Sequence, residues 1–240
     1  IYGLIVGYNI TQGWFPFIKS TGGQILDTTL TKAMFNDPKS IEGMQKFASL
    51  ANELKISPTR AATQAAGSEW AYFGSGKGAM YFIQSSNAGA INEKFPDLDW
   101  DVVMMPKGWD GNRVVPTVVN NWAIFSKTDK AVQDAAWTWL AYWLGDESQK
   151  ILGQKAPAGF PVKLTGLAEM EKGSAKPVNK KAYTDGMAEG GQTLCDNPTW
   201  AEWVGEAQKV MFDLYDGKVT AEDAGKKANE AVQKVLDSAK

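Results

Sequence analysis

Tryptophans and residues with amide side chains are the residues of this chain whose types and positions suit a chemical function. Its 240 residues include 10 Trp, 7 Tyr, 10 Phe and no histidine. Without histidine, Ser-His-Asp and Cys-His catalysis and histidine-based metal sites are excluded. An indole ring offers a flat apolar face and one N–H donor, while amides and hydroxyls donate and accept hydrogen bonds. The chemistry that these groups suit is non-covalent capture of a solute that has both apolar and polar parts, such as a sugar.

The candidate binding residues stand where predicted strands end or helices begin. One pair lies at a strand-to-helix junction near residue 13, and a small polar run follows the apolar segment 79–83. Two amides precede a tryptophan inside 117–125, and two further tryptophans open a helix near residue 200. The predicted ligand-binding residues are Gln12, Trp14, Gln84, Ser85, Ser86, Asn120, Asn121, Trp122, Trp200 and Trp203. By contrast, Trp137, Trp139 and Trp143 lie at helical spacing in an apolar stripe, which predicts core positions.

Other motifs favour structural roles over chemistry. The glycine-rich segment 73–80 lacks the spacing and the Lys-Ser/Thr ending of a phosphate loop, so a tight turn explains it better. The alternating carboxylates of 97–101 lack the glycine and the bidentate glutamate of a calcium loop. No metal or cofactor is predicted. Three carboxylates leave a glycosidase pair open as an alternative, although solvated surface positions explain them better: Glu69, Glu93 and Glu202.

Composition predicts a globular protein. Hydrophobic residues make up 44% and charged residues 22%, and the net charge of -2 comes without a basic stripe, which excludes nucleic acid as a partner. The single cysteine, Cys195, excludes an intramolecular disulfide. Periodicity predicts an α/β sandwich with extra C-terminal helices. The expected strands cover 1–6, 79–83, 101–106 and 117–125, and the expected helices cover 38–54, 68–73, 88–95, 129–144, 200–214 and 221–236.

Several segments, in order, resemble the sugar-binding extracellular proteins of ABC importers, the group that includes maltose-binding protein. The matching segments are 14–18 with 20–23, 73–80, 120–124, 136–149, 160–162 and 217–224. The resemblance implies a type II periplasmic-binding-protein-like fold, with a sugar or oligosaccharide enclosed between two lobes and delivered to permease membrane subunits. It also implies a periplasmic location, or lipid anchoring outside a Gram-positive cell. The alternatives are a carbohydrate-active enzyme that uses a carboxylate pair and a protein-interaction module.

The resemblance also implies how the chain is divided. Residues 1–103 and 166–240 correspond to two parts of the C-terminal lobe, and 104–165 to a hinge-crossing segment that packs on the N-terminal lobe. Most of that N-terminal lobe is absent, so it is expected as a partner. Two positions depart from the family pattern: Gln84-Ser85-Ser86 replaces a Gly-x-Trp stacking position, and Asn120-Asn121 replaces a glycine pair.

Overall fold

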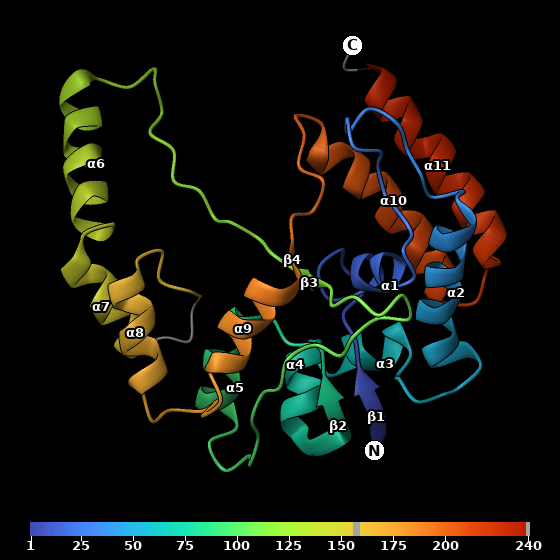
Figure 1. Cartoon of the computed structure of the whole chain (residues 1–240), viewed down its shortest axis with the longest axis horizontal. Coiled ribbons are helices and arrows are strands. Elements are labelled where there is room, and N and C mark those ends of the chain that lie inside the picture. Colours follow the sequence, from blue (N-terminus) through green and yellow to red (C-terminus); the bar gives the residue numbers. More distant parts are fainter. Residues whose placement is uncertain (156–158, 239–240) are drawn as a thin grey trace. The chain divides into compact units, whose positions relative to one another are not determined.

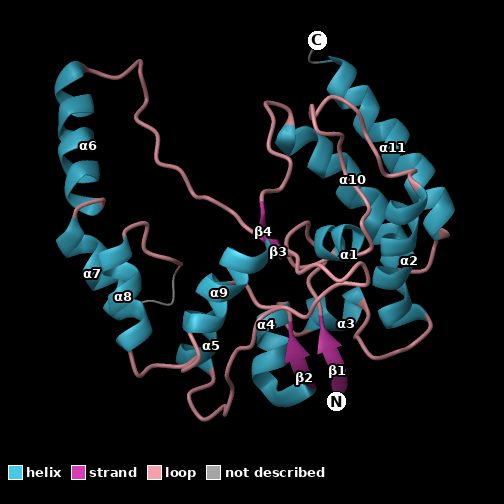
Figure 2. Cartoon of the chain, in the orientation of Figure 1, coloured by secondary structure: helices cyan, strands magenta, loops and turns pink. Residues whose placement is uncertain are grey.

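The computed structural model describes residues 1–155 and 159–238, so 156–158 of the predicted crossing segment lie outside the described residues. Helices dominate it (Figures 1 and 2). The α-helices are α1 (Trp14–Ser20), α2 (Pro38–Asn52), α3 (Arg60–Ala65), α4 (Glu69–Tyr72), α5 (Ala88–Lys94), α6 (Lys130–Trp143), α7 (Asp146–Lys155), α8 (Leu164–Lys172), α9 (Lys181–Gly190), α10 (Trp200–Tyr215) and α11 (Ala221–Ser238). A π-helical turn covers Phe73–Lys77, and a 3-10 turn covers Ser85–Asn87.

The strands form two short parallel pairs. β1 (Tyr2–Ile5) pairs with β2 (Gly78–Tyr81), with Leu4 opposite Met80, and β3 (Val115–Pro116) pairs with β4 (Gly191–Gln192). The prediction that 79–83 is a buried strand is wrong about burial, because Met80 is 60% exposed. β1 is its one partner strand among the described residues, so much of the pair stays uncovered.

The two other expected strands are not strands in this structure. Residues 101–106 and 117–125 are extended and carry no regular strand pairing. Strand formation needs a neighbour that takes up the backbone N–H and C=O groups. In 101–106 a side chain does this instead, because the Asn179 amide donates to the Val102 carbonyl oxygen at 3.0 Å. Apolar runs predict extended backbone, but they do not supply a partner strand.

By its contacts the chain divides into two compact units. The first unit comprises residues 1–83, 104–117 and 185–240, and the second comprises 84–103 and 118–184. The bounds of the predicted lobes rest on the family resemblance, so they stay a prediction beside these units. Among the described residues, no helix has the length and apolarity needed to cross a membrane.

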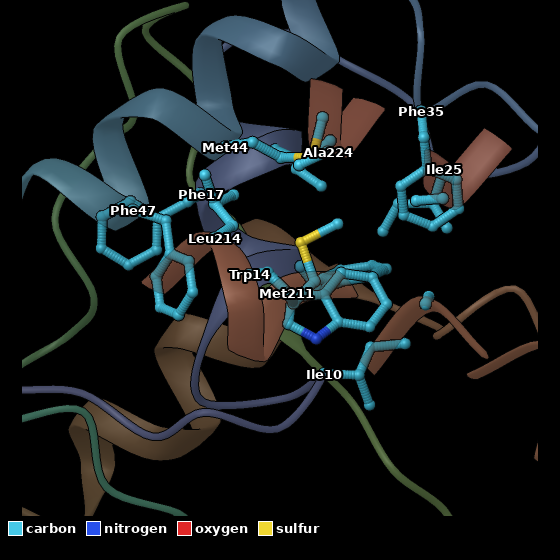
Figure 3. Close-up of a cluster of buried hydrophobic side chains, with 14 of the residues drawn as sticks. Ile10, Trp14, Phe17, Ile25, Phe35, Met44, Phe47, Met211, Leu214 and Ala224 are labelled. Atoms are coloured by element: carbon cyan, nitrogen blue, oxygen red, sulfur yellow. The ribbon is translucent and has the colours of Figure 1, made fainter. Parts of the chain in front are cut away.

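The first unit is built around a helical core that joins distant parts of the sequence. Helix α2 packs against α1, α10 and α11 (Figure 1). Figure 3 shows side chains from these helices meeting, with Trp14 beside Met211 and Met44 beside Ala224. The helices predicted over 200–214 and 221–236 are α10 and α11, and their buried side chains supply much of this core, with Met211 1% exposed. Periodicity therefore predicted these helices correctly.

Local signals explain where these helices begin. Pro38 opens α2 after Asp37, whose carboxylate accepts a hydrogen bond from the Lys39 backbone N–H at 2.9 Å. Before α11, the Thr220 hydroxyl accepts from the Asp223 backbone N–H at 3.1 Å, which is one of the two hydrogen bonds of a capping box. The chain passes from the π-helical turn into β2 through Gly76, whose φ of +73° suits glycine.

In the second unit, α6 carries tryptophans on its surface. Trp137 is 65% exposed and Trp139 is 49% exposed, and Trp143 is only half-buried. The prediction that these rings are core is therefore wrong for this chain. Within α6, Leu140 is buried. The helical stripe itself is real, but a stripe is buried only where another element covers it.

Candidate functional site

Gln12 and Trp14 lie inside the first unit. The Gln12 amide Nε2 donates to the Tyr81 hydroxyl at 2.7 Å and to the Phe82 carbonyl oxygen at 2.9 Å, and the side chain is 7% exposed. Trp14 is fully buried, and its indole N–H donates to Gln208 Oε1 at 3.3 Å. The expectation that Trp14 offers an open ring face does not hold. Gln12 ties the start of α1 to the residues that end β2.

The two tryptophans of α10 differ in their environments. Trp203 is 0% exposed, so it offers no face to a solute, and its indole N–H donates to Asn197 Oδ1 at 3.2 Å. Trp200 is half-buried, with its indole nitrogen shielded from solvent and unbonded among the described residues. Of this pair, only Trp200 keeps part of its ring accessible.

Asn197 is a positioning residue that the sequence predictions missed. Its Oδ1 accepts hydrogen bonds from the Thr199 backbone N–H at 3.1 Å, the Thr199 hydroxyl at 3.2 Å and the Trp203 indole. Its Nδ2 donates to the Leu30 carbonyl oxygen at 3.1 Å. Asn197 thus fixes the beginning of α10 and ties it to a distant loop. An Asn two residues before the expected N-cap is the signal that could have indicated this turn.

Gln84, Ser85 and Ser86 lie together in the second unit. Gln84 has extended backbone, and the 3-10 turn of Ser85–Asn87 leads directly into α5. Ser86 is exposed, whereas Gln84 and Ser85 are half-buried. Ser85 also lines a cavity of about 20 Å³ together with Lys180 and Tyr183. The run therefore presents polar groups both to solvent and to the interior of the unit.

Asn120, Asn121 and Trp122 are exposed in the extended part of the second unit, and Trp122 belongs to a group of three rings. Trp139 and Trp143 are stacked with 5.8 Å between centroids and 8° between planes. Trp122 lies edge-on to Trp139, with their centroids 5.2 Å apart. We call Trp122, Trp139 and Trp143 the tryptophan cluster. A stacked pair with a third ring at right angles can hold an apolar face while indole N–H groups donate hydrogen bonds.

The acidic segment 97–101, which was predicted to be structural, makes hydrogen bonds and an ion pair within the protein. The Asp101 carboxylate accepts from the backbone N–H groups of Val102 and Asn179, each at 2.9 Å, and Asp99 pairs with Lys176 at 3.0 Å. Among the described residues, no group of three acidic, cysteine or histidine side chains could hold a metal ion. Burial raises the pKa of the Cys195 thiol, which disfavours the reactive thiolate.

A larger cavity in the first unit was not predicted. It has a volume of about 180 Å³, and its mostly apolar walls include Phe17, Phe82 and Trp109. The Lys46 ammonium lies 4.6 Å from the centroid of the Trp109 ring, at cation–π distance. With few polar groups in its walls, this cavity suits an apolar group better than a sugar.

Several solved structures share the fold of this chain. A maltose/maltodextrin-binding domain of Bdellovibrio bacteriovorus, bound to maltotriose, matches with a TM-score of 0.81 and 16% identity, over 98% of this chain and 60% of that one. An ABC substrate-binding protein of Listeria monocytogenes, in complex with cycloalternan, matches with a TM-score of 0.79 and 17% identity, over 99% and 59%. A solute-binding protein of Thermotoga lettingae, bound with α-D-tagatose, matches with a TM-score of 0.78 and 20% identity, over 98% of this chain and 60% of that one.

These likenesses confirm the predicted fold, an α/β periplasmic-binding-protein-like type II fold. The chain spans about 60% of the length of the solved structures it matches. No curated protein sequence matches it. The sequence profile of the family described as bacterial extracellular solute-binding protein matches residues 55–181, more than half of the 240 residues. This family binds solutes and does not transform them, so the enzyme alternative is wrong. The chain belongs to the bacterial extracellular solute-binding protein family.

Proposed function

We propose that this chain is part of the binding protein of an ABC importer and that its solute is a carbohydrate. The observation that carries the proposal is the match to the maltotriose-bound domain over 98% of this chain. The exposed amides and rings agree with it, because a sugar needs both stacking faces and fixed hydrogen-bonding groups. The location is periplasmic, or extracellular with a lipid anchor, and the permease subunits of the importer receive the solute.

Burial divides the predicted binding residues into two groups. Those that contact the solute are the ones that keep accessible surface: Gln84, Ser85, Ser86, Asn120, Asn121, Trp122 and Trp200. Gln12, Trp14 and Trp203 are buried inside the first unit and have a structural role there. Trp139 and Trp143 hold the ring of Trp122 in place. Because a ring fixed by its neighbours loses little conformational entropy on binding, this support strengthens the contact.

The remaining part of the protein covers exposed apolar side chains of α6. Val132, Trp137 and Tyr142 are each more than half exposed on this helix. Exposed apolar side chains of this size are costly to leave in water, and the matched structures are longer than this chain. We place the N-terminal lobe against this helix, with residues 104–165 crossing toward it and 1–103 and 166–240 forming the C-terminal lobe. Solute binding stabilises closure through its higher affinity for the closed state.

The test is titration of the 240-residue chain with maltotriose, followed by calorimetry and by chromatography of the sugar. We expect a saturable heat and no cleavage product. Trp122→Ala lowers the affinity by about tenfold, since losing one buried ring contact costs on the order of 1–1.5 kcal/mol. Trp137→Ala is the matched control, because it removes an equally exposed ring of the second unit that lies outside the tryptophan cluster.

Two results would contradict the proposal. The first is the absence of saturable heat with maltotriose and with a set of other oligosaccharides, both for this chain and for the protein that includes the N-terminal lobe. The second is the appearance of cleaved sugar, which would restore an enzymatic function. Equal losses in the two tryptophan variants would instead reject the assignment of Trp122 to the solute site.

A further inference from the structure

A small cavity in the second unit is lined by polar side chains, most of which are not among the predicted binding residues. Its volume is about 20 Å³, and its walls include Ser85, Phe160, Met170, Pro177, Lys180 and Tyr183. Ser85 belongs to the loop that the proposed function assigns to the solute. The cavity therefore lies directly against this loop and next to the start of α9.

Tyr183 carries a hydroxyl group whose hydrogen bonding is incomplete. Its Oη is shielded from solvent and has no hydrogen-bond partner among the described residues. The Phe160 ring packs against the Tyr183 ring at right angles, 5.5 Å between centroids, which fixes the orientation of the phenol. Burial raises the pKa of Tyr183, so the group stays a neutral phenol that can both donate and accept. A buried hydroxyl without a partner is destabilising, and folded proteins rarely keep one.

Lys180 brings a hydrogen-bond donor to the same cavity. Its side chain is 6% exposed, and the ammonium donates to the carbonyl oxygens of Gly173 at 2.7 Å and Ala175 at 2.6 Å. An ammonium has three N–H donors, and these two bonds leave one of them without an acceptor among the described residues. Burial lowers the pKa of Lys180, although the negative charge of Asp101 acts to raise it. One more acceptor atom in the cavity would complete the hydrogen bonding of the ammonium.

We propose that this cavity binds one hydroxyl oxygen, which accepts from Lys180 and exchanges hydrogen bonds with the hydroxyl groups of Tyr183 and Ser85. The size fits, because a cavity of roughly 10–15 Å³ on this measure already holds one water-sized group. Three polar groups also match the number of partners that a buried water usually has. The oxygen comes from a water molecule or from a hydroxyl group of the solute. The second source rests on the proposed function, whereas the first does not.

The variant Tyr183→Phe distinguishes a filled cavity from an empty one by the sign of its effect. If the cavity were empty, removing an unpartnered hydroxyl would leave the stability unchanged or raise it. If water fills it, the variant loses a hydrogen bond, and the ratio of folded to unfolded chain in urea falls about fivefold. Tyr142→Phe is the matched control, because Tyr142 is 58% exposed in the same unit. We expect no change in that control.

A second measurement identifies the source of the oxygen. If a solute hydroxyl fills the cavity, Tyr183→Phe keeps the stability of the sugar-free chain but lowers its affinity for maltotriose about fivefold. Ser85→Ala provides an independent variant and shows the same pattern from the opposite wall.

Unchanged or raised stability, together with unchanged maltotriose affinity, overturns the proposal. If the chain binds no maltotriose at all, the proposed function fails separately. The stability measurement then decides between a water and an empty cavity.

Discussion

Replacing Asn197 with alanine tests whether this side chain holds the beginning of α10. The change removes the acceptor for the Trp203 indole N–H, which lies in a fully buried side chain. A buried donor left without a partner costs about 1–3 kcal/mol. Loss of the bonds to Thr199 and Leu30, which are partly accessible to water, adds about 1 kcal/mol. We therefore expect Asn197→Ala to lower the free energy of unfolding by about 2–4 kcal/mol.

Urea unfolding followed by circular dichroism measures this loss. Asn197→Asp keeps an acceptor for Trp203 and Thr199 but places a carboxylate oxygen against the Leu30 carbonyl, so we expect it to destabilise the chain by about 1–2 kcal/mol, less than Asn197→Ala. Asn120→Ala, at an exposed amide, is the control and leaves the free energy of unfolding within about 0.5 kcal/mol of the wild-type value.

A double-mutant cycle isolates the indole bond. Trp203→Phe removes the N–H while keeping an aromatic ring, so Asn197→Ala then costs less in the W203F background than in the wild type. The expected coupling is about 1–2 kcal/mol. Additive effects of the two changes, or a loss below about 0.5 kcal/mol for Asn197→Ala, refute the reasoning.

Three further changes test the first unit. The Arg60 guanidinium bonds both oxygens of Asp216, at 3.1 and 2.7 Å, and this bonding lowers the pKa of Asp216. The contribution of this ion pair is therefore present at neutral pH and lost as pH falls through the lowered pKa of Asp216. Urea unfolding should then separate wild type from Arg60→Gln more at pH 7 than in acid, where the contact of Arg60 with the Phe212 ring remains. Gly43→Ala places Cβ 2.4 Å from the Ile18 Cα and destabilises by about 1–3 kcal/mol. The Cβ added in Gly76→Ala meets no atom within 4 Å, but the positive φ of this position lowers the stability of the variant by about 1–2 kcal/mol. Thermal unfolding measures the loss of stability in both glycine variants.

Sequence periodicity predicted helices well where other helices cover their apolar stripes. The spacing in α10 and α11 selected residues that are buried, such as Met211 and Ala228, because both helices pack with α2. The same rule predicted helix α6 but misplaced Trp139, since spacing reports which residues share a face and not whether a neighbour covers it. The short helices α7, α8 and α9 were not predicted at all, and each has ten or fewer residues.

The predicted binding residues show the same division between type and environment. The sequence analysis predicted a polar run after β2, in which Ser86 is exposed and Ser85 is half-buried. It could not separate Trp14 from Trp122, because both stand beside amides at the end of an apolar run. Their environments differ completely: Trp14 is 0% exposed and Trp122 is 58% exposed. Tertiary packing, which local sequence does not encode, makes that difference.

We predict that Gln12 affects binding although it is buried, because it holds the segment that leads into Gln84. Gln12 bonds the backbone of Phe82, two residues before Gln84, and its short contacts resist displacement of that segment. A loop that is already in its binding conformation loses less entropy when a solute arrives. Gln12→Ala should therefore weaken maltotriose binding although its amide is occupied inside the protein. Trp137→Ala, on an exposed face outside the tryptophan cluster, should not. If Gln12→Ala leaves the affinity for maltotriose unchanged, the end of β2 does not position Gln84, Ser85 and Ser86 for binding.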